Sequence, residues 1–181
     1  IGCNDIRDEG VAHLADVLGR CRLLTHLNLC CNRITTEGAT LLFLVLPMCP
    51  ILAHLDLQDN PIAHTTAVLL PCPSLTYLNL GTNRIKDGGA RRLAAVLPAF
   101  PCLSRLDLEG NGIGTVGITI LAEVLPQCSI LTHLNLSRNR LKEYGMEGIK
   151  MLASVLPQCQ SLSRLDLRQN NIGAEGIAWL A

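Results

Sequence analysis

An eleven-residue segment recurs six times along this 181-residue chain, and its leucines and one asparagine hardly change. The copies read LTHLNLCCNRI, LAHLDLQDNPI, LTYLNLGTNRI, LSRLDLEGNGI, LTHLNLSRNRL and LSRLDLRQNNI. The asparagines that follow each strand-like stretch are separated by 28, 28, 23, 28, 28 and 31 residues. A period of this length is typical of one supersecondary unit stacked many times along an axis. These asparagines are Asn4, Asn32, Asn60, Asn83, Asn111, Asn139 and Asn170.

Each unit predicts a strand followed by a helix. Leu27 and Leu29 alternate with His26 and Asn28, which is the period of two of a half-buried strand. The downstream stretch TEGATLLFLVL carries apolar residues at helical spacing, and a threonine at 35 or 36 can cap it. Parallel strands lie about 4.8 Å apart and packed helices about 10 Å apart, so such an array must curve. We therefore predict an α/β horseshoe with parallel strands on the concave face and helices on the convex face.

The unit L-x-x-L-x-L-x-x-N-x-I/L, followed by a helical segment ending in V-L-P-x-C or close to it, resembles the leucine-rich repeat. The likeness is to the 28-residue type found in ribonuclease inhibitor and in the receptor domains of NOD-like innate immune proteins. It covers the whole chain and implies a single leucine-rich repeat domain over residues 1–181, with about six to seven repeats. Because the chain starts and stops inside a unit, we expect a fragment of a longer protein, or uncapped ends that stack on a partner or self-associate end to end.

Three further sets of residues recur in phase and predict structural roles. The asparagines should form a polar ladder that bonds to backbone groups at the turns. Glycines six residues further on should lie where neighbouring helices approach closely. Five cysteines share a position with Phe100, so this position should be an apolar core site with free thiols, as in a cytosolic or nuclear protein. The glycines are Gly10, Gly38, Gly89, Gly117 and Gly176, and the cysteines are Cys21, Cys49, Cys72, Cys128 and Cys159.

Two units depart from 28 residues. The unit that follows Asn60 is five residues shorter, has Thr66 in place of the phased glycine, and predicts only a short helix over about 65–70. The unit that follows Asn139 is three residues longer, with Gly148 nine residues after the asparagine. The extra residues lie in a loop over 142–147, for which either simple length drift or a binding role remains open.

The residues between the strand leucines should line the concave face in three rows. The first row is aromatic or basic throughout, the second alternates amides with carboxylates, and the third is mixed. Tyr and Arg are favoured at binding hot spots, so this face predicts a protein partner, whereas the alternative is a solvated surface with pairs such as Arg105 and Asp107. The predicted partner-binding residues are His26, Asn28, His54, Asp56, Tyr77, Asn79, Arg105, Asp107, Glu109, His133, Asn135, Arg164, Asp166 and Arg168.

The chain shows no motif of an assembled catalytic or cofactor site, so we predict a non-catalytic protein without cofactor or metal. His26, His54 and Asp56 could form a zinc set, which is the weaker interpretation. Cys30 should face the concave surface, and the adjacent Cys31 cannot easily bridge to it. Lys plus Arg and Asp plus Glu number 15 each, and this balance predicts neither nucleic-acid nor membrane-surface binding. No apolar run is long enough to span a bilayer, and we predict a cytoplasmic location.

The favoured function is a protein-interaction scaffold. Resemblance to NOD-like receptors implies a ligand-sensing domain, and resemblance to ribonuclease inhibitor implies a basic enzyme as partner, although the mixed charge of the concave rows disfavours the second. The alternative is regulation of an enzyme, as in the leucine-rich repeat activators of the small GTPase Ran, whose acidic tail has no counterpart here.

Overall fold

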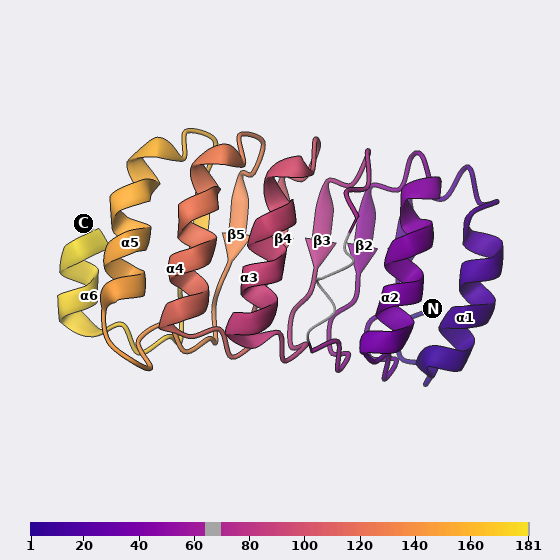
Figure 1. Cartoon of the computed structure of the whole chain (residues 1–181), viewed down its shortest axis with the longest axis horizontal. Coiled ribbons are helices and arrows are strands. Elements are labelled where there is room, and N and C mark those ends of the chain that lie inside the picture. The colour runs from indigo at the N-terminus through magenta and orange to yellow at the C-terminus, as the bar shows by residue number, and fades with distance from the viewer. Residues whose placement is uncertain (64–69, 181) are drawn as a thin grey trace.

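The computed structural model describes residues 1–63 and 70–180, in which six short parallel strands form one sheet in sequence order. The helices lie over one face of this sheet in a single layer, as Figure 1 shows. This arrangement confirms the predicted α/β solenoid with parallel strands on one face and helices on the other. The strands are β1 (His26–Asn28), β2 (His54–Asp56), β3 (Tyr77–Asn79), β4 (Arg105–Asp107), β5 (His133–Asn135) and β6 (Arg164–Asp166). The α-helices are α1 (Arg7–Leu18), α2 (Thr36–Val45), α3 (Lys86–Val96), α4 (Thr115–Val124), α5 (Glu147–Val155) and α6 (Gly173–Leu180).

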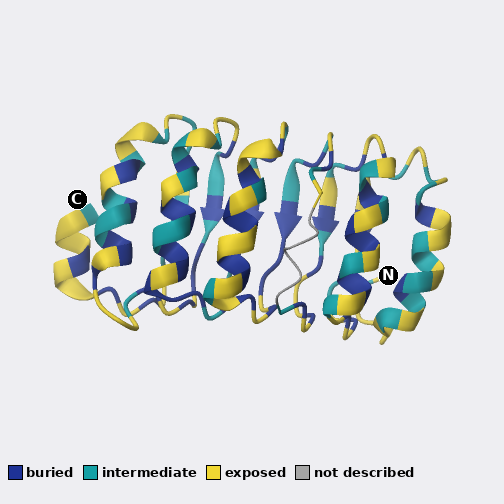
Figure 2. Cartoon of the chain, viewed as in Figure 1, coloured by how far each residue is buried: buried dark blue, intermediate teal, exposed yellow. Residues whose placement is uncertain are grey.

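The strand register places one leucine of every strand beside its counterparts. Leu106 pairs with Leu78 on one side and with Leu134 on the other, and each of the three is nearly inaccessible to solvent. The buried side chains lie between the sheet and the helices, which expose their outer faces (Figure 2). The core is therefore a continuous layer of aliphatic side chains, as the repeat predicts.

The asparagine ladder is confirmed. Asn60 is 1% exposed, its Oδ1 accepts the backbone N–H groups of Asn32 and Ile34, and its Nδ2 donates to the carbonyl of Leu57. Each amide thus joins the turn of its own repeat to the turn of the preceding one. The two ends differ: Asn4 is exposed, and the buried Oδ1 of Asn170 is without a partner among the described residues.

Acidic side chains of one repeat accept hydrogen bonds from the start of the helix in the next repeat, a role that the sequence analysis did not predict. Thr35 caps α2 as predicted, and its backbone N–H and its hydroxyl both donate to Asp8 of the preceding repeat. One carboxylate oxygen of Asp87 likewise accepts from the N–H groups of Gly114 and Gly117. A Cβ added to Gly117 would lie 3.1 Å from the Cα of Asp87, which confirms the close approach predicted for the phased glycines.

The cysteine position in phase with Phe100 is an apolar core site in the central repeats. Cys49 and Cys72 are 1% and 2% exposed, and Phe100 is 5% exposed. Cys21, Cys128 and Cys159 are only partly buried. Just before this position, the leucine and proline of the V-L-P segment form one 3-10 turn, because proline is favourable in the first turn of a helix. These turns are η1 (Leu46–Met48), η3 (Leu97–Ala99), η4 (Leu125–Gln127) and η5 (Leu156–Gln158).

The two irregular units have different outcomes. The helix predicted over 65–70, with Thr66, lies outside the fully described residues. In the longer unit, the extra residues form a turn in which Tyr144 is 77% exposed and Gly145 has a φ of 118°. In helix α5 of this longer unit, Lys150 Nζ lies 5.2 Å from the ring centroid of Trp179 in α6. Among the described residues, no helix has the length and apolar character needed to cross a bilayer.

Candidate protein-binding face

The sheet register assembles the first predicted row across all six strands. His26 pairs with His54, His54 with Tyr77, and the row continues through the remaining three strands. The side chains of this row stand on the face of the sheet opposite the leucines, because successive strand residues point to opposite faces. All its members are exposed or partly exposed. The row comprises His26, His54, Tyr77, Arg105, His133 and Arg164.

Strands β1 to β3 present an aromatic stack. The His26 and His54 rings are 4.1 Å apart between centroids and only 12° from parallel, and Tyr77 follows at 5.9 Å and 56°. Partial burial, together with the nearby His26 and Arg105, lowers the pKa of His54. Among the described residues, His26, His54 and Asp56 do not form a cluster that could hold a metal ion, so the zinc interpretation is wrong. Rings stacked face to face direct their nitrogen lone pairs outward in their own planes, not toward one ion between them.

The second row has a structural role that the sequence analysis did not assign. The Oδ1 atom of Asp107 accepts the backbone N–H of Glu109, and the Oδ1 of Asn135 accepts that of Ser137. The same bond, to the N–H two residues further on, forms in all six strands and turns the chain out of the strand. Asn and Asp both provide this oxygen at this reach, which explains why the row holds only these two residue types. Asn79 is 5% exposed, so little of it is accessible to a partner. The row comprises Asn28, Asp56, Asn79, Asp107, Asn135 and Asp166.

Strands β3 to β6 surround a hollow of about 190 Å³ on this face. Tyr77, Arg105, His133, Arg164 and Arg168 contribute to its wall, together with carboxylates of the second row. The hollow therefore lies in the half of the face where the first row is basic.

The carboxylates around this hollow are already engaged. Asp107 Oδ2 accepts from Asn135 Nδ2 at 2.8 Å. Arg168 pairs with Asp166 at 2.6 Å, and its hydrogen bonds hold the pKa of that carboxyl below its usual value. The ion pair between Arg105 and Asp107 considered above is not formed, so that interpretation is wrong for this pair. Within the described part of the chain, neither Arg105 nor Arg164 takes part in an ion pair.

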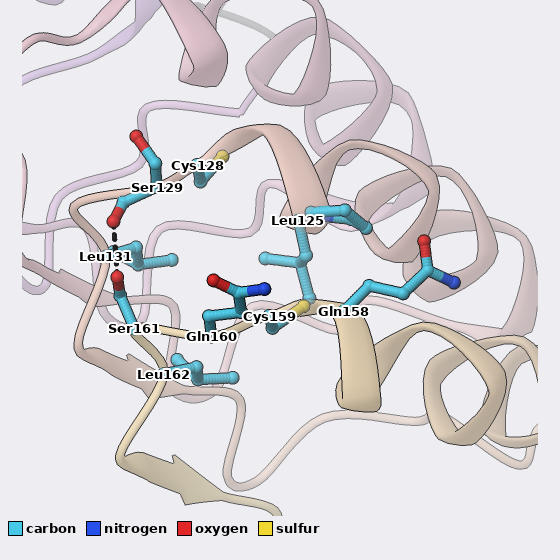
Figure 3. Close-up of a pocket in the computed structure, with 10 residues that line it drawn as sticks. Leu125, Cys128, Ser129, Leu131, Gln158, Cys159, Gln160, Ser161 and Leu162 are labelled. Atoms are coloured by element: carbon cyan, nitrogen blue, oxygen red, sulfur yellow. Dashed lines mark hydrogen bonds between the residues drawn. The ribbon is translucent and has the colours of Figure 1, made fainter.

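A larger hollow of about 390 Å³ lies at the sheet edge between two consecutive 3-10 turns, away from the rows (Figure 3). The hydroxyl of Ser161 donates to the carbonyl of Ser129 across it. A smaller hollow of about 100 Å³ occupies the same place one repeat earlier, so this groove follows from the stacking of turns. Burial raises the pKa of Cys128 in its wall to about 11, which leaves a protonated thiol rather than a nucleophile.

Three thiols gather at the N-terminal edge of the face, where sequence reasoning placed only Cys30. The Sγ atoms of Cys3, Cys30 and Cys31 all lie within 4.8 Å of one another. The neighbouring Cys3 thiol, ahead of burial, raises the pKa of Cys31 to about 12. The signal that sequence reasoning missed is the repeat itself, because Cys3 and Cys31 both stand directly before a ladder asparagine.

Comparison with known proteins places this geometry in a family. The family model described as Leucine Rich repeat matches residues 20–43, 72–94, 101–122, 127–153 and 158–181, which is more than half of the chain. A search of curated proteins finds no match. Among solved structures, the Leiomodin-1 Actin-Binding Site 2 is similar, with a TM-score of 0.56 and 18% identity over 93% of this chain and 86% of that one. The tropomodulin C-terminal domain of Caenorhabditis elegans is similar with a TM-score of 0.56 and 14% identity, over 94% and 88% of the two chains. The chain belongs to the leucine-rich repeat family.

Proposed function

We propose that this domain is a non-catalytic scaffold that binds a protein partner on its concave strand face. The observation that carries the proposal is the first row, in which six large side chains with polar tips stand in register on an otherwise uncovered sheet face. Helices cover only the opposite face (Figure 1). Tyr and Arg bury large areas and still offer hydrogen-bond donors, which is why they dominate binding hot spots.

The partner segment that best fits strands β3 to β6 is acidic. Arg105 and Arg164 lie on either side of His133 in the register, and neither arginine is in an ion pair in the described structure. A carboxylate seated in the hollow between them would gain two guanidinium donors without breaking an existing pair. Arginine binds carboxylates bidentately, so such a contact also fixes the orientation of the partner.

The second row and Glu109 support this contact rather than make it. Asp107, Asn135 and Asp166 each commit one oxygen to a backbone turn, and Glu109 is paired with Arg138 at 3.4 Å. We therefore propose the first row, extended by Arg168, as the principal contact surface, with the remaining predicted residues at its rim. The cytoplasm, where the nine thiols of this chain would stay reduced, is the compartment that we propose.

The experiment that tests the proposal replaces the two unpaired arginines. A fluorescent poly-glutamate peptide and actin, the latter taken from the name of the leiomodin site, would be titrated against the wild type and against Arg105→Glu with Arg164→Glu. The matched control is Arg22→Glu with Arg91→Glu, which makes the same change of charge at exposed positions away from the strands. Both variants would first be compared with the wild type by circular dichroism.

We expect the concave variant to lose peptide binding at least tenfold, and we expect the control to bind like the wild type. Equal losses in both variants would show a general charge effect and would contradict the proposed face. Actin binding that follows the same pattern would name a partner. Actin binding that is equal in all three proteins would place any actin contact elsewhere. The ligand-sensing and GTPase-regulating alternatives make the same face the contact surface and differ only in the partner captured.

A further inference from the structure

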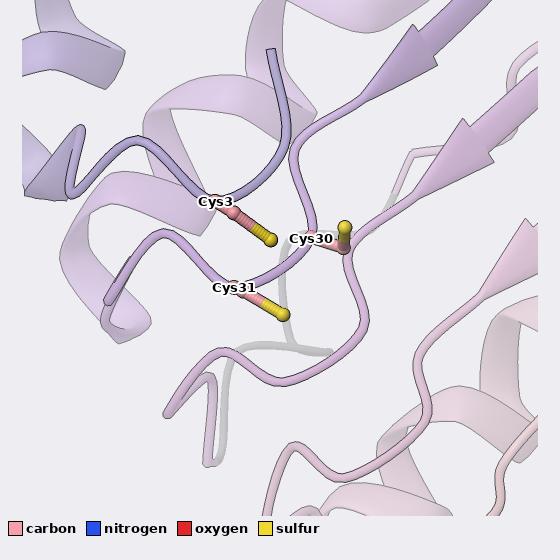
Figure 4. A group of neighbouring side chains, drawn as sticks. All are labelled: Cys3, Cys30 and Cys31. Atoms are coloured by element: carbon pink, nitrogen blue, oxygen red, sulfur yellow. The ribbon is translucent and has the colours of Figure 1, made fainter.

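We propose that Cys3, Cys30 and Cys31 form a binding site for one thiophilic metal ion, with Zn²⁺ as the ion that fits best. Nothing in the proposed protein-binding function requires this site, and its residues come from two consecutive repeats. Figure 4 shows the Cys3 and Cys31 side chains pointing in the same direction, with the Cys30 sulfur beside them. No other group of three His, Cys, Asp or Glu side chains with this proximity occurs among residues 1–63 and 70–180.

The position of Cys3 is fixed by the solenoid rather than by chance. Cys3 and Cys31 are 28 residues apart and both precede a ladder asparagine, with φ values of 58° and 53°. The backbone N–H of Cys3 donates to the carbonyl of Cys30 at 2.8 Å. The next residue, Asn4, donates its N–H to Asn32 Oδ1 at 2.9 Å. Equivalent backbone conformations in stacked turns therefore direct both thiols to the same side.

The distances suit a metal better than a disulfide. Zinc–sulfur bonds are about 2.3 Å long, so tetrahedral ligands place their sulfurs about 3.8 Å apart. Sulfurs that already lie within 4.8 Å need to close by about 1 Å, which side-chain rotation supplies at an exposed edge. A disulfide needs about 2.05 Å and would join only two of the three thiols. Three sulfur ligands and no histidine select thiophilic ions over Mg²⁺ or Ca²⁺.

The surroundings accept both the ion and its fourth ligand. A hollow of about 500 Å³ borders Cys31 and is also lined by Arg33, Asp59 and Arg84. Binding would convert three S–H groups to thiolates, release three protons to solvent and leave a ZnS₃ unit with a net charge of −1. Arg84, together with Arg33 that also pairs with Asp5 at 3.1 Å, offsets part of that charge, and a water molecule in the hollow completes a tetrahedral site. Asp59 occupies the position before the ladder asparagine of the next repeat, as Cys3 and Cys31 do in theirs.

The distribution of cysteines along the chain also favours a dedicated site. Five of the nine cysteines occupy the phased position on the helical side, which the core explains. Four remain, and three of these four meet at one place. The fourth, Cys102, is partly exposed on its own and provides the matched control.

The test is a titration of Cd²⁺, a spectroscopic substitute for Zn²⁺, into the full chain kept reduced with a phosphine. Thiolate-to-cadmium absorption in the ultraviolet reports binding, and added Zn²⁺ should displace the Cd²⁺. We expect one ion per chain with sulfur ligation in the wild type and in Cys102→Ser. Each of Cys3→Ser, Cys30→Ser and Cys31→Ser should weaken binding by more than the roughly 10–100-fold that loss of an outer-shell partner costs.

A second measurement separates metal binding from a folding defect. Excess Zn²⁺ should raise the melting temperature of the wild type and of Cys102→Ser, because an ion that binds only the folded state stabilises it. It should not do so for Cys31→Ser, whose metal-free melting should match the wild type. Retention of the cadmium absorption in a variant with all three serines would overturn the proposal. An equal loss of cadmium binding in Cys102→Ser would also overturn it. So would a thiol titration showing a disulfide between two of the three cysteines in protein purified under reducing conditions.

Discussion

The strand face has two halves. They share the same backbone register, and they differ in the side chains of the first row. In β1 to β3 the first row is His26, His54 and Tyr77; the two histidine rings stack, and the tyrosine ring contacts His54 at a tilt. In β4 to β6 the same row is Arg105, His133 and Arg164, and the two guanidinium groups lack carboxylate partners within the described structure. The strand leucines beneath are buried in β1 to β5 and only partly buried in the edge strand β6.

This difference indicates what each half of the face can offer to a partner. A row of aromatic rings offers a large contact surface but few unpaired hydrogen-bond donors, so it would contribute to binding through shape and apolar contact. A row of unpaired arginines beside a hollow offers unmet charge, so its contribution is specific for anionic groups. We infer that the basic half selects the partner and that the aromatic half extends the contact.

The largest effect should come from the ladder, in which the Oδ1 of Asn60 has two backbone partners and that of Asn170 has none among the described residues. In Asn60→Ala, two buried backbone N–H groups, of Asn32 and Ile34, lose their acceptor. At about 1–3 kcal/mol for each unpaired group, we expect about 2–6 kcal/mol of lost stability, measured by urea unfolding. In Asn170→Ala no N–H loses an acceptor, because that Oδ1 has no partner among the described residues, and we expect a clearly smaller loss. Equal losses would show that the C-terminal rung is satisfied in solution.

Truncation of the core leucines should be nearly as costly and should not distinguish the halves. Leu55 and Leu106 are 0% and 2% exposed at equivalent register positions. We expect Leu55→Ala and Leu106→Ala each to lower the free energy of unfolding by about 2–5 kcal/mol. The surface variant Arg105→Ala should change it by less than about 0.5 kcal/mol. An unchanged denaturation curve for Leu106→Ala would refute the strand register.

Much of this architecture could be predicted from the sequence because periodic positions carry periodic roles. The alternation of Leu27 and Leu29 with polar residues predicts the strand, and the spacing of the asparagines predicts the ladder. Both depend on interactions with equivalent residues in the next repeat, so one copy of the motif informs the others. The first and second rows were predictable for the same reason.

Features that depend on a single side-chain conformation were not predictable. Whether Arg105 pairs with Asp107 is decided by Asn135, which donates to that carboxylate instead. The zinc interpretation was wrong because ring orientation, which no spacing reveals, stacks His26 on His54. The Cys3 thiol joins Cys30 and Cys31 because the unit that contains Cys3 stacks on the next unit through backbone hydrogen bonds. The role of Asp8 and Asp87 as caps for helices of the next repeat was missed because the bond crosses between units.

The dependence of binding on ionic strength should distinguish the electrostatic contribution of the basic half from the apolar contact made by the aromatic half. If the basic half selects an acidic partner, poly-glutamate binding should fall by about tenfold or more between about 0.1 M and about 1 M salt, as the Debye length shortens from about 10 Å to about 3 Å. The variant with Arg105→Glu and Arg164→Glu should lose this salt dependence. Tyr77→Ala should weaken binding at every salt concentration and keep the slope. A slope that survives both arginine changes would move the selective charge away from Arg105 and Arg164.

The smallest expected effect concerns the aromatic half and its pH dependence. Because the folded pKa of His54 lies below the value of about 6.5 in the unfolded chain, the stability it contributes is present above that pH. This stability is lost as the pH falls through the lower folded pKa, where the charged ring meets His26 and Arg105 and the stack is weakened. Because His54 is exposed and water screens its charge, we expect wild-type stability to decline only slightly more than that of His54→Gln between about pH 7 and about pH 5. Unfolding curves of both proteins across this range, with His133→Gln in the basic half as the control, would measure the difference. If His54→Gln and the wild type decline in parallel, the stack does not depend on a neutral His54, and the two halves differ in charge but not in how their side chains satisfy one another.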